Sequence, residues 1–260
     1  MAALALALLA PFILTQTLEA QAAPLDSADE LVAQIRAGGR PAPEAFDYQG
    51  TARMVRFDPG QPASRGAEKL LALAKEIEAE ATDVTYSHST SVSRRRGRYH
   101  FDCSGMMNWM LERVAPKALE TINRERPVAS SYVRVIESAP TDRHRKGWQR
   151  VEFLADVRPG DIFAWRRPAN WPKGGNTGHV GIVAAEPEPV PHIANAYVIR
   201  VYDSTQYAHQ DDAREADEAT GFGTGTILFM GDDQGRPIGY GWYGSDSGGW
   251  YRTDVVFGRL

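Results

Sequence analysis

The order of two sequence patterns most constrains what this chain can fold into. Apolar residues recur at helical spacing over residues 66–81, 103–115 and 128–138. From Trp148 onward the pattern changes to short apolar runs separated by clusters of Gly, Pro, Asn and Asp, which is typical of strands joined by turns. Because the helices come first and do not alternate with the strands, we predict an α+β domain with helices packed on a mostly antiparallel β-sheet.

Short apolar runs predict the individual strands, and a proline predicts the end of one helix. The strands are VEFL, IFAW, HVGIVAAE, YVIRVYDS, GTILFM, IGYGWY and DVVFGRL. The helix over 103–115 carries one apolar stripe, made of Met106, Met107, Met110, Leu111 and Val114. We expect Pro116 to end this helix, because proline lacks the backbone N–H that would continue it. The stripe should face the rest of the domain.

The first 65 residues differ from the rest. An apolar run from Ala2 to Leu14 precedes the small-residue pattern Ala20-Gln21-Ala22, so we interpret residues 1–22 as a signal peptide. The run is shorter than the ~20 residues that span a bilayer. A buried N-terminal helix is the alternative. Residues 23–65, rich in Ala, Pro, Gly and Asp, predict a loosely structured extension, and residues 66–260 the globular domain. The protein is then secreted or periplasmic.

Charge and cysteine content narrow the function classes. The 260 residues include 29 basic and 33 acidic ones, so the net charge is −4 and nothing in this balance calls for nucleic acid or an anionic membrane as partner. The chain has one cysteine, Cys103. One thiol cannot form an internal disulfide, which is the usual structural use of cysteine in exported proteins. Cys103 is therefore a nucleophile, an intermolecular link or an inert buried residue.

The position of Cys103 favours the nucleophile. It lies at the start of the helix over 103–115, where unpaired backbone N–H groups and the helix dipole favour a thiolate. Asp102 suits the helix cap, and Gly105 leaves the first turn open to a substrate. The helix position alone fits a nucleophile and an inert buried cysteine equally well.

A histidine and an aspartate complete a candidate relay. His179 opens the apolar strand HVGIVAAE beside a polar loop, and Gly178 and Gly181 allow other groups to approach it. Asp203 alternates onto the same strand face as Ile199 and Val201, where a carboxylate needs a partner. Asp203 can orient the His179 ring if the two strands are neighbours. A surface or core role for the histidine, and a turn-capping role for the aspartate, are the alternatives.

These residues also resemble a known family. FDCSG before an amphipathic helix, then VRPGDIFAW, then GHVGIV and a polar residue on the next strand, resemble the NlpC-type, papain-like cysteine peptidases of bacterial cell walls. The resemblance covers roughly residues 84–206. It implies Cys103 as nucleophile, His179 as base and Asp203 as orienting group. Tyr86, Asp102 and Ser104 are the expected oxyanion or substrate contacts.

The resemblance implies a hydrolase that cleaves amide bonds, with peptidoglycan stem peptides as the substrate partner. No cofactor is expected, and a zinc site is not expected because a second cysteine and a His-x-x-x-His spacing are lacking. Two alternatives remain: an acyl transferase of the same fold, which would pass the acyl group to an amine, and a catalytically silent wall-binding module.

A cationic run, an acidic segment and a group of aromatic residues each have a structural interpretation, and two of them also have a functional alternative. We expect the cationic run at 93–98 to be a solvated loop, with attraction of stem-peptide carboxylates as the alternative. The acidic segment 209–221 lacks an apolar face, so we expect an exposed loop. Core or turn packing is expected for most of a group of aromatic residues, with a glycan-binding groove as the alternative. These aromatics are Trp165, Trp171, Trp242, Tyr243, Trp250 and Tyr251.

Overall fold

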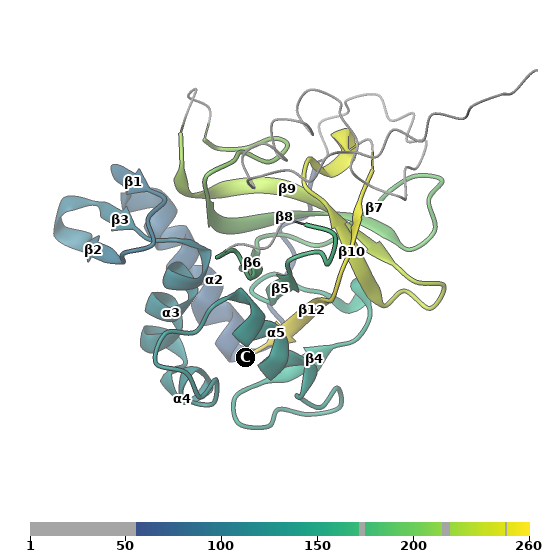
Figure 1. Ribbon diagram of the computed structural model, residues 1–260, viewed down its shortest axis with the longest axis horizontal. Helices are drawn as coiled ribbons and strands as arrows, with labels where there is room; N and C mark the ends of the chain where they lie inside the picture. Colours follow the sequence, from purple (N-terminus) through teal and green to yellow (C-terminus); the bar gives the residue numbers. More distant parts are fainter. Residues whose placement is uncertain (1–55, 172–174, 215–218, 248) are drawn as a thin grey trace, which may run out of the picture.

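The computed structural model describes residues 56–260 except 172–174, 215–218 and 248. The predicted signal peptide and most of the predicted extension lie outside the described residues. Among the described residues, four α-helices come before the large sheet, namely α2 (Arg65–Glu80), α3 (Cys103–Val114), α4 (Pro116–Glu120) and α5 (Ala129–Glu137). They lie together on one side of the molecule in Figure 1. The helices predicted over 66–81, 103–115 and 128–138 are therefore confirmed.

The strands form two sheets. The larger has nine strands, ordered β11-β10-β9-β8-β6-β5-β12-β4 with β7 on β8, and every pair is antiparallel. Its strands are β4 (Gln149–Val151), β5 (Ile162–Arg166), β6 (Gly178–Val183), β7 (Glu188–Pro189), β8 (Ala196–Thr205), β9 (Gly221–Gly231), β10 (Pro237–Gly241), β11 (Tyr251–Arg252) and β12 (Val255–Arg259). The smaller is mixed: β3 (Arg98–His100) lies between the parallel β1 (Asp83–Thr85) and the antiparallel β2 (Ser91–Ser93). The α+β prediction is confirmed.

Some expected boundaries are wrong. The run VEFL is not one strand, because β4 ends at Val151 and the 3₁₀ turn η2 (Leu154–Asp156) takes its last residue. The expected end of the helix over 103–115 is confirmed, because α3 stops at Val114 with Ala115 as its cap. Pro116 then opens α4, since the first position of a helix needs no N–H donor. The run at 93–98 contains the 3₁₀ turn η1 (Arg94–Arg96) before β3.

The packing of α3 on the large sheet positions its first residue. Four residues of the predicted stripe are buried in one cluster with Val180 and Ile182 of β6, and α3 also contacts β8. The buried stripe residues are Met106, Met107, Met110 and Leu111. The start of α3 lies next to β8, because Ser204 of β8 donates its hydroxyl to the carbonyl of Phe101 at 2.7 Å, so the helix N-terminus is close to the strand that carries the predicted aspartate.

Strand β6 begins at a residue that has to be glycine. Gly178 has φ +132°, and a Cβ there would lie 1.8 Å from the carbonyl oxygen of Trp165 on β5. This close approach brings the start of β6 against the end of β5, where Trp165 and His179 are cross-strand partners. The backbone freedom of Gly178 therefore fixes where the His179 side chain leaves the sheet.

Candidate active site

Cys103 is the first residue of α3 and is held there by a capped helix start. Asp102 Oδ1 accepts the Gly105 N–H at 2.6 Å and the Ser104 hydroxyl at 2.9 Å, so its predicted role as the cap is confirmed. Asp102 Oδ2 lies 3.0 Å from His88 Nδ1. Burial would raise the pKa of Asp102, but these hydrogen bonds lower it. The cap is therefore an ionised acceptor, and it leaves the Cys103 side chain facing the cavity.

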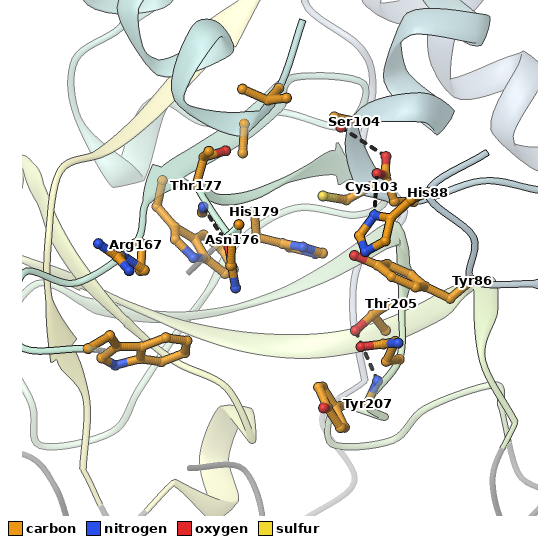
Figure 2. A pocket seen from close by; sticks show the side chains of 18 of the residues that line it. Tyr86, His88, Cys103, Ser104, Arg167, Asn176, Thr177, His179, Thr205 and Tyr207 are labelled. Carbon is orange, nitrogen blue, oxygen red and sulfur yellow. Dashed lines mark hydrogen bonds and ion pairs between the residues drawn. The ribbon is translucent and has the colours of Figure 1, made fainter. Parts of the chain in front are cut away.

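His179 lies beside the thiol. Figure 2 shows the sulfur of Cys103 pointing toward the His179 ring. The Nε2 atom of His179 is 2.6 Å from Asp203 Oδ2, so Nδ1 is the nitrogen left for the sulfur. Burial would lower the pKa of His179, but the negative charge of Cys103 and hydrogen bonds with Asp203 and Cys103 raise it to about 9. An imidazolium next to a thiolate is the arrangement that these interactions stabilise.

Asp203 lies in β8 rather than in the turn after it, and its carboxylate is fully buried. Oδ2 is 2.6 Å from the Nε2 atoms of both His179 and His209. Oδ1 accepts from Nη1 and Nη2 of Arg214, each at 3.0 Å. Burial would raise the pKa of Asp203, but attraction to His209 and Arg214 and the histidine hydrogen bonds hold it well below its usual range. The carboxylate is therefore ionised and has acceptor contacts on both oxygens.

The expectation of an exposed loop over 209–221 is right for Asp211 and Ala213 but wrong for other described residues of that segment. His209, Gln210 and Arg214 are buried, and two of them bind the predicted orienting aspartate. Its buried side chains are polar because they bind Asp203, Ser245 and Asp212, so these residues carry no apolar periodicity. The signal that could have found it was Asp203 itself, because a carboxylate on an apolar face requires a nearby partner.

Tyr86 follows β1, and its hydroxyl points toward the space between Cys103 and His179 in Figure 2. Its backbone N–H donates to Thr220 Oγ1 at 3.2 Å. The pKa of the Tyr86 hydroxyl is raised, mainly by burial and to a smaller extent by the negative charges of Cys103, Asp102 and Asp203. The phenol therefore keeps its hydrogen and can donate it to a negatively charged atom in the cavity. The Ser104 hydroxyl, in contrast, donates its hydrogen bond to the Asp102 carboxylate that caps α3.

A cavity of about 930 Å³ opens over these residues. Its lining includes Cys103, His179 and Tyr86, together with Arg126 and Arg167 on the loops around it. Five of the six aromatic residues expected mostly in core or turn packing line it, and several also belong to the core cluster behind it. These five are Trp165, Trp171, Trp242, Tyr243 and Tyr251. Trp250 packs elsewhere, with β8 and β9.

His179, Asp203 and His209 are also close enough to share a metal ion. Their ligand atoms lie within 4.8 Å of one another, and this is the one such group among the residues described. Both Nε2 atoms already contact Asp203 Oδ2, however, and the Arg214 guanidinium is bound to Oδ1. A cation here would break two hydrogen bonds and sit beside a guanidinium. The donor set fits an internal hydrogen-bond network better than a metal.

Comparisons with known proteins leave the family open. No protein-family model matches the chain, and no solved structure matches it. An uncharacterized protein of Acanthamoeba polyphaga mimivirus is 28% identical over 159 residues, an alignment that covers 54% of this chain and 67% of that protein. Within the described ranges, no helix has the length and apolar character needed to cross a membrane.

Proposed function

We propose that this protein is a cysteine hydrolase that cleaves amide bonds through Cys103, His179 and Asp203. The observation that carries the proposal is the contact chain at the cavity floor, in which a thiol at a helix N-terminus faces a histidine bound to a buried carboxylate. A nucleophile, a base within reach and a third group that orients the base form the general arrangement for acyl transfer. The resemblance to NlpC-type peptidases gives the same three roles.

The reaction follows from the position of each group. The Cys103 thiolate attacks the amide carbon, and the carbonyl electron pair moves to oxygen. The Cys103 backbone N–H and the Tyr86 hydroxyl donate to this oxyanion. The C–N bond then breaks as the His179 imidazolium gives its Nδ1 proton to the leaving amine. Neutral His179 takes a proton from water, the hydroxide attacks the thioester, and the acid leaves as thiolate and imidazolium re-form.

The substrate class is the more specific part of the proposal. The cavity is lined by aromatic residues, among them Trp165, Trp171 and Trp242, and by the basic residues Arg126 and Arg167. Stem peptides of peptidoglycan offer amide bonds, carboxylates and adjoining sugar rings, which suit such a lining. With the sequence expectation of export, we propose a secreted or periplasmic enzyme acting on the cell wall.

The reactivity of Cys103 tests the enzyme proposal without a substrate. A free thiol with a pKa of about 8.5 is ionised by less than about 1% at pH 6, so an ion pair with His179 should speed alkylation by iodoacetamide about 100-fold at that pH. We expect His179→Ala to remove this acceleration. His144, exposed and outside the cavity, provides the matched control. Slow labelling that does not depend on His179 would instead support a wall-binding module.

Product analysis then tests the bond. Purified full chain is incubated with peptidoglycan, and the products are identified by mass spectrometry, with Cys103→Ala as the blank. New free carboxyl and amino ends support hydrolysis. In the presence of an added amine, a new amide in place of the free acid would identify the acyl transferase. Intact peptidoglycan from a chain with fast, His179-dependent labelling would exclude this substrate and keep the thiol chemistry.

A further inference from the structure

The carboxylate that orients His179 is itself held by a second group of residues, and no step of the proposed reaction uses them. His209 and Arg214 follow β8 and turn back to bind Asp203. The Arg214 side chain is 3% exposed and the His209 side chain is fully buried. We propose that His209 and Arg214 are positioning residues, which fix the Asp203 carboxylate so that Oδ2 faces His179. This inference rests on the proposed function of the same site.

The contacts on Asp203 divide between its two oxygens. Arg214 binds Oδ1 with two nitrogens of its guanidinium plane, which limits rotation of the carboxylate about its last bond. His209 and His179 both reach Oδ2 at 2.6 Å. A carboxylate has about four acceptor positions, and these four donor contacts fill them. Asp203 is therefore held by Arg214 through the oxygen that His179 does not contact and by His209 through the oxygen that they share, so its orientation does not depend on His179 alone.

The donor role of His209 follows from its two ring nitrogens. Its Nε2 contacts the ionised carboxylate, and its buried Nδ1 has no hydrogen-bond partner. A hydrogen on Nδ1 would be buried without an acceptor, which favours the tautomer with its hydrogen on Nε2. The ring also packs on Trp242, with centroids 4.1 Å apart. The histidine thus offers one donor and one aromatic surface, and substitutions can separate these two properties.

A third residue holds the loop that presents both groups. Asp212 accepts the backbone N–H of His209 at 2.7 Å and the Nε and Nη2 groups of Arg214 at 2.6 and 2.7 Å. Arg214 Nη1 also donates to the carbonyl of Gly221, where β9 begins. Arg200 also contacts this loop: it donates to the Asp211 carbonyl and to Thr224 Oγ1, and it has no hydrogen bond to Asp203. Arg200 is therefore a matched control for loop structure.

The ionisable groups facing Asp203 come from several elements. His179 is on β6, Cys103 on α3 and Tyr86 after β1, while His209, Asp212 and Arg214 are on the loop after β8. Asp203 raises the pKa of His179 through its charge and hydrogen bond. A misplaced carboxylate should therefore lower the pKa of His179 and narrow the pH range in which imidazolium and thiolate coexist.

A pair of His209 variants tests the proposal. His209→Gln keeps an N–H donor at the position of Nε2 and loses the ring, whereas His209→Phe keeps the ring on Trp242 and loses the donor. For His209→Phe we expect about a tenfold slower alkylation of Cys103 at pH 6 and, with a substrate, an alkaline limit of turnover about one pH unit lower. His209→Gln should stay within about threefold of the unmodified protein. With a substrate, the loss should fall on kcat and leave KM unchanged.

The opposite order would overturn the proposal, because a packing role predicts that Phe is tolerated and Gln is not. An Arg pair gives a second measurement: Arg214→Gln should slow alkylation at least tenfold more than Arg200→Gln, and equal effects would overturn the role of Arg214. Thermal unfolding followed by circular dichroism verifies that each variant is folded. Alkylation needs no substrate, so failure to find a cleaved bond counts against the proposed function and leaves this inference standing.

Discussion

Replacing Asp203 by Asn removes one charge from the buried network and keeps the shape of the side chain. The amide offers one oxygen where the carboxylate offered two, so its NH₂ group faces either the guanidinium of Arg214 or the N–H groups of two histidines. His179 can keep a hydrogen bond to the NH₂ group only by moving its hydrogen to Nδ1. That tautomer cannot accept a proton from the thiol, and loss of the correct tautomer costs about 10⁴-fold in kcat in a comparable triad.

The stability cost of the same change follows from burial. Asp203 is fully buried and the Arg214 side chain is 3% exposed, so Asp203→Asn removes one of the two carboxylates paired with a buried cation and leaves it Asp212 alone. Breaking a buried ion pair by removing one partner costs about 3 to 5 kcal/mol. For a domain of this size, 1 kcal/mol moves Tm by about 2 to 4 °C, which gives a loss of roughly 6 to 20 °C.

A second buried pair separates stability from chemistry. Asp161 is fully buried and accepts from Arg259 through both oxygens at 2.8 Å, and it does not line the cavity. Asp161→Asn should lower Tm by a similar amount while the His179-dependent alkylation of Cys103 stays fast. Asp203→Asn should lower both Tm and alkylation at pH 6. Equal alkylation rates in the two variants would refute the assignment of Asp203 as the orienting group.

Three further changes test the rest of the site. The pKa of His179 is raised to about 9, so the imidazolium is present below that pH, and turnover, which needs the imidazolium to protonate the leaving amine, should decline as pH rises through about 9. Asp102→Ala removes the cap of α3 and should lower the free energy of unfolding by about 1 kcal/mol, measured by urea titration. Tyr86→Phe removes the hydroxyl next to Cys103 and should lower kcat about 10²-fold with little change in KM; an unchanged kcat would leave the Cys103 N–H as the oxyanion donor.

The helices and the central strands could be predicted because each carries a local signal. The stripe from Met106 to Leu111 and the alternation of Ile199, Val201 and Asp203 both reflect burial of one face, and the structure buries those faces. The mixed sheet of β1, β2 and β3 was missed because its strands have three residues each and are mostly polar. Pairing of such short strands is decided by neighbours in space, which no local window contains.

In the candidate site, too, some residues carried a local sequence signal and others did not. Cys103, His179 and Asp203 each occupy a position that is unusual for its residue type, and the structure brings them together. His209 and Arg214 occupy a segment whose composition is that of a solvated loop, and only its contact with Asp203 distinguishes it. A polar residue is buried when its partners are buried with it, so this part of the site could be found only after the fold was known.

The desolvation free energy of the buried network around Asp203 indicates what the network is for. Asp203, His209, Asp212 and Arg214 are buried polar or charged groups next to a histidine that is itself 8% exposed. Desolvating such groups cancels much of their mutual attraction, and apolar replacements of similar volume are often as stable or more stable. A requirement for stability alone would therefore be met as well by an apolar cluster against Trp242. A requirement for one fixed hydrogen-bond direction at His179 would not, because an apolar cluster supplies no acceptor for the ring N–H. The network thus supports a site selected for the orientation of its base.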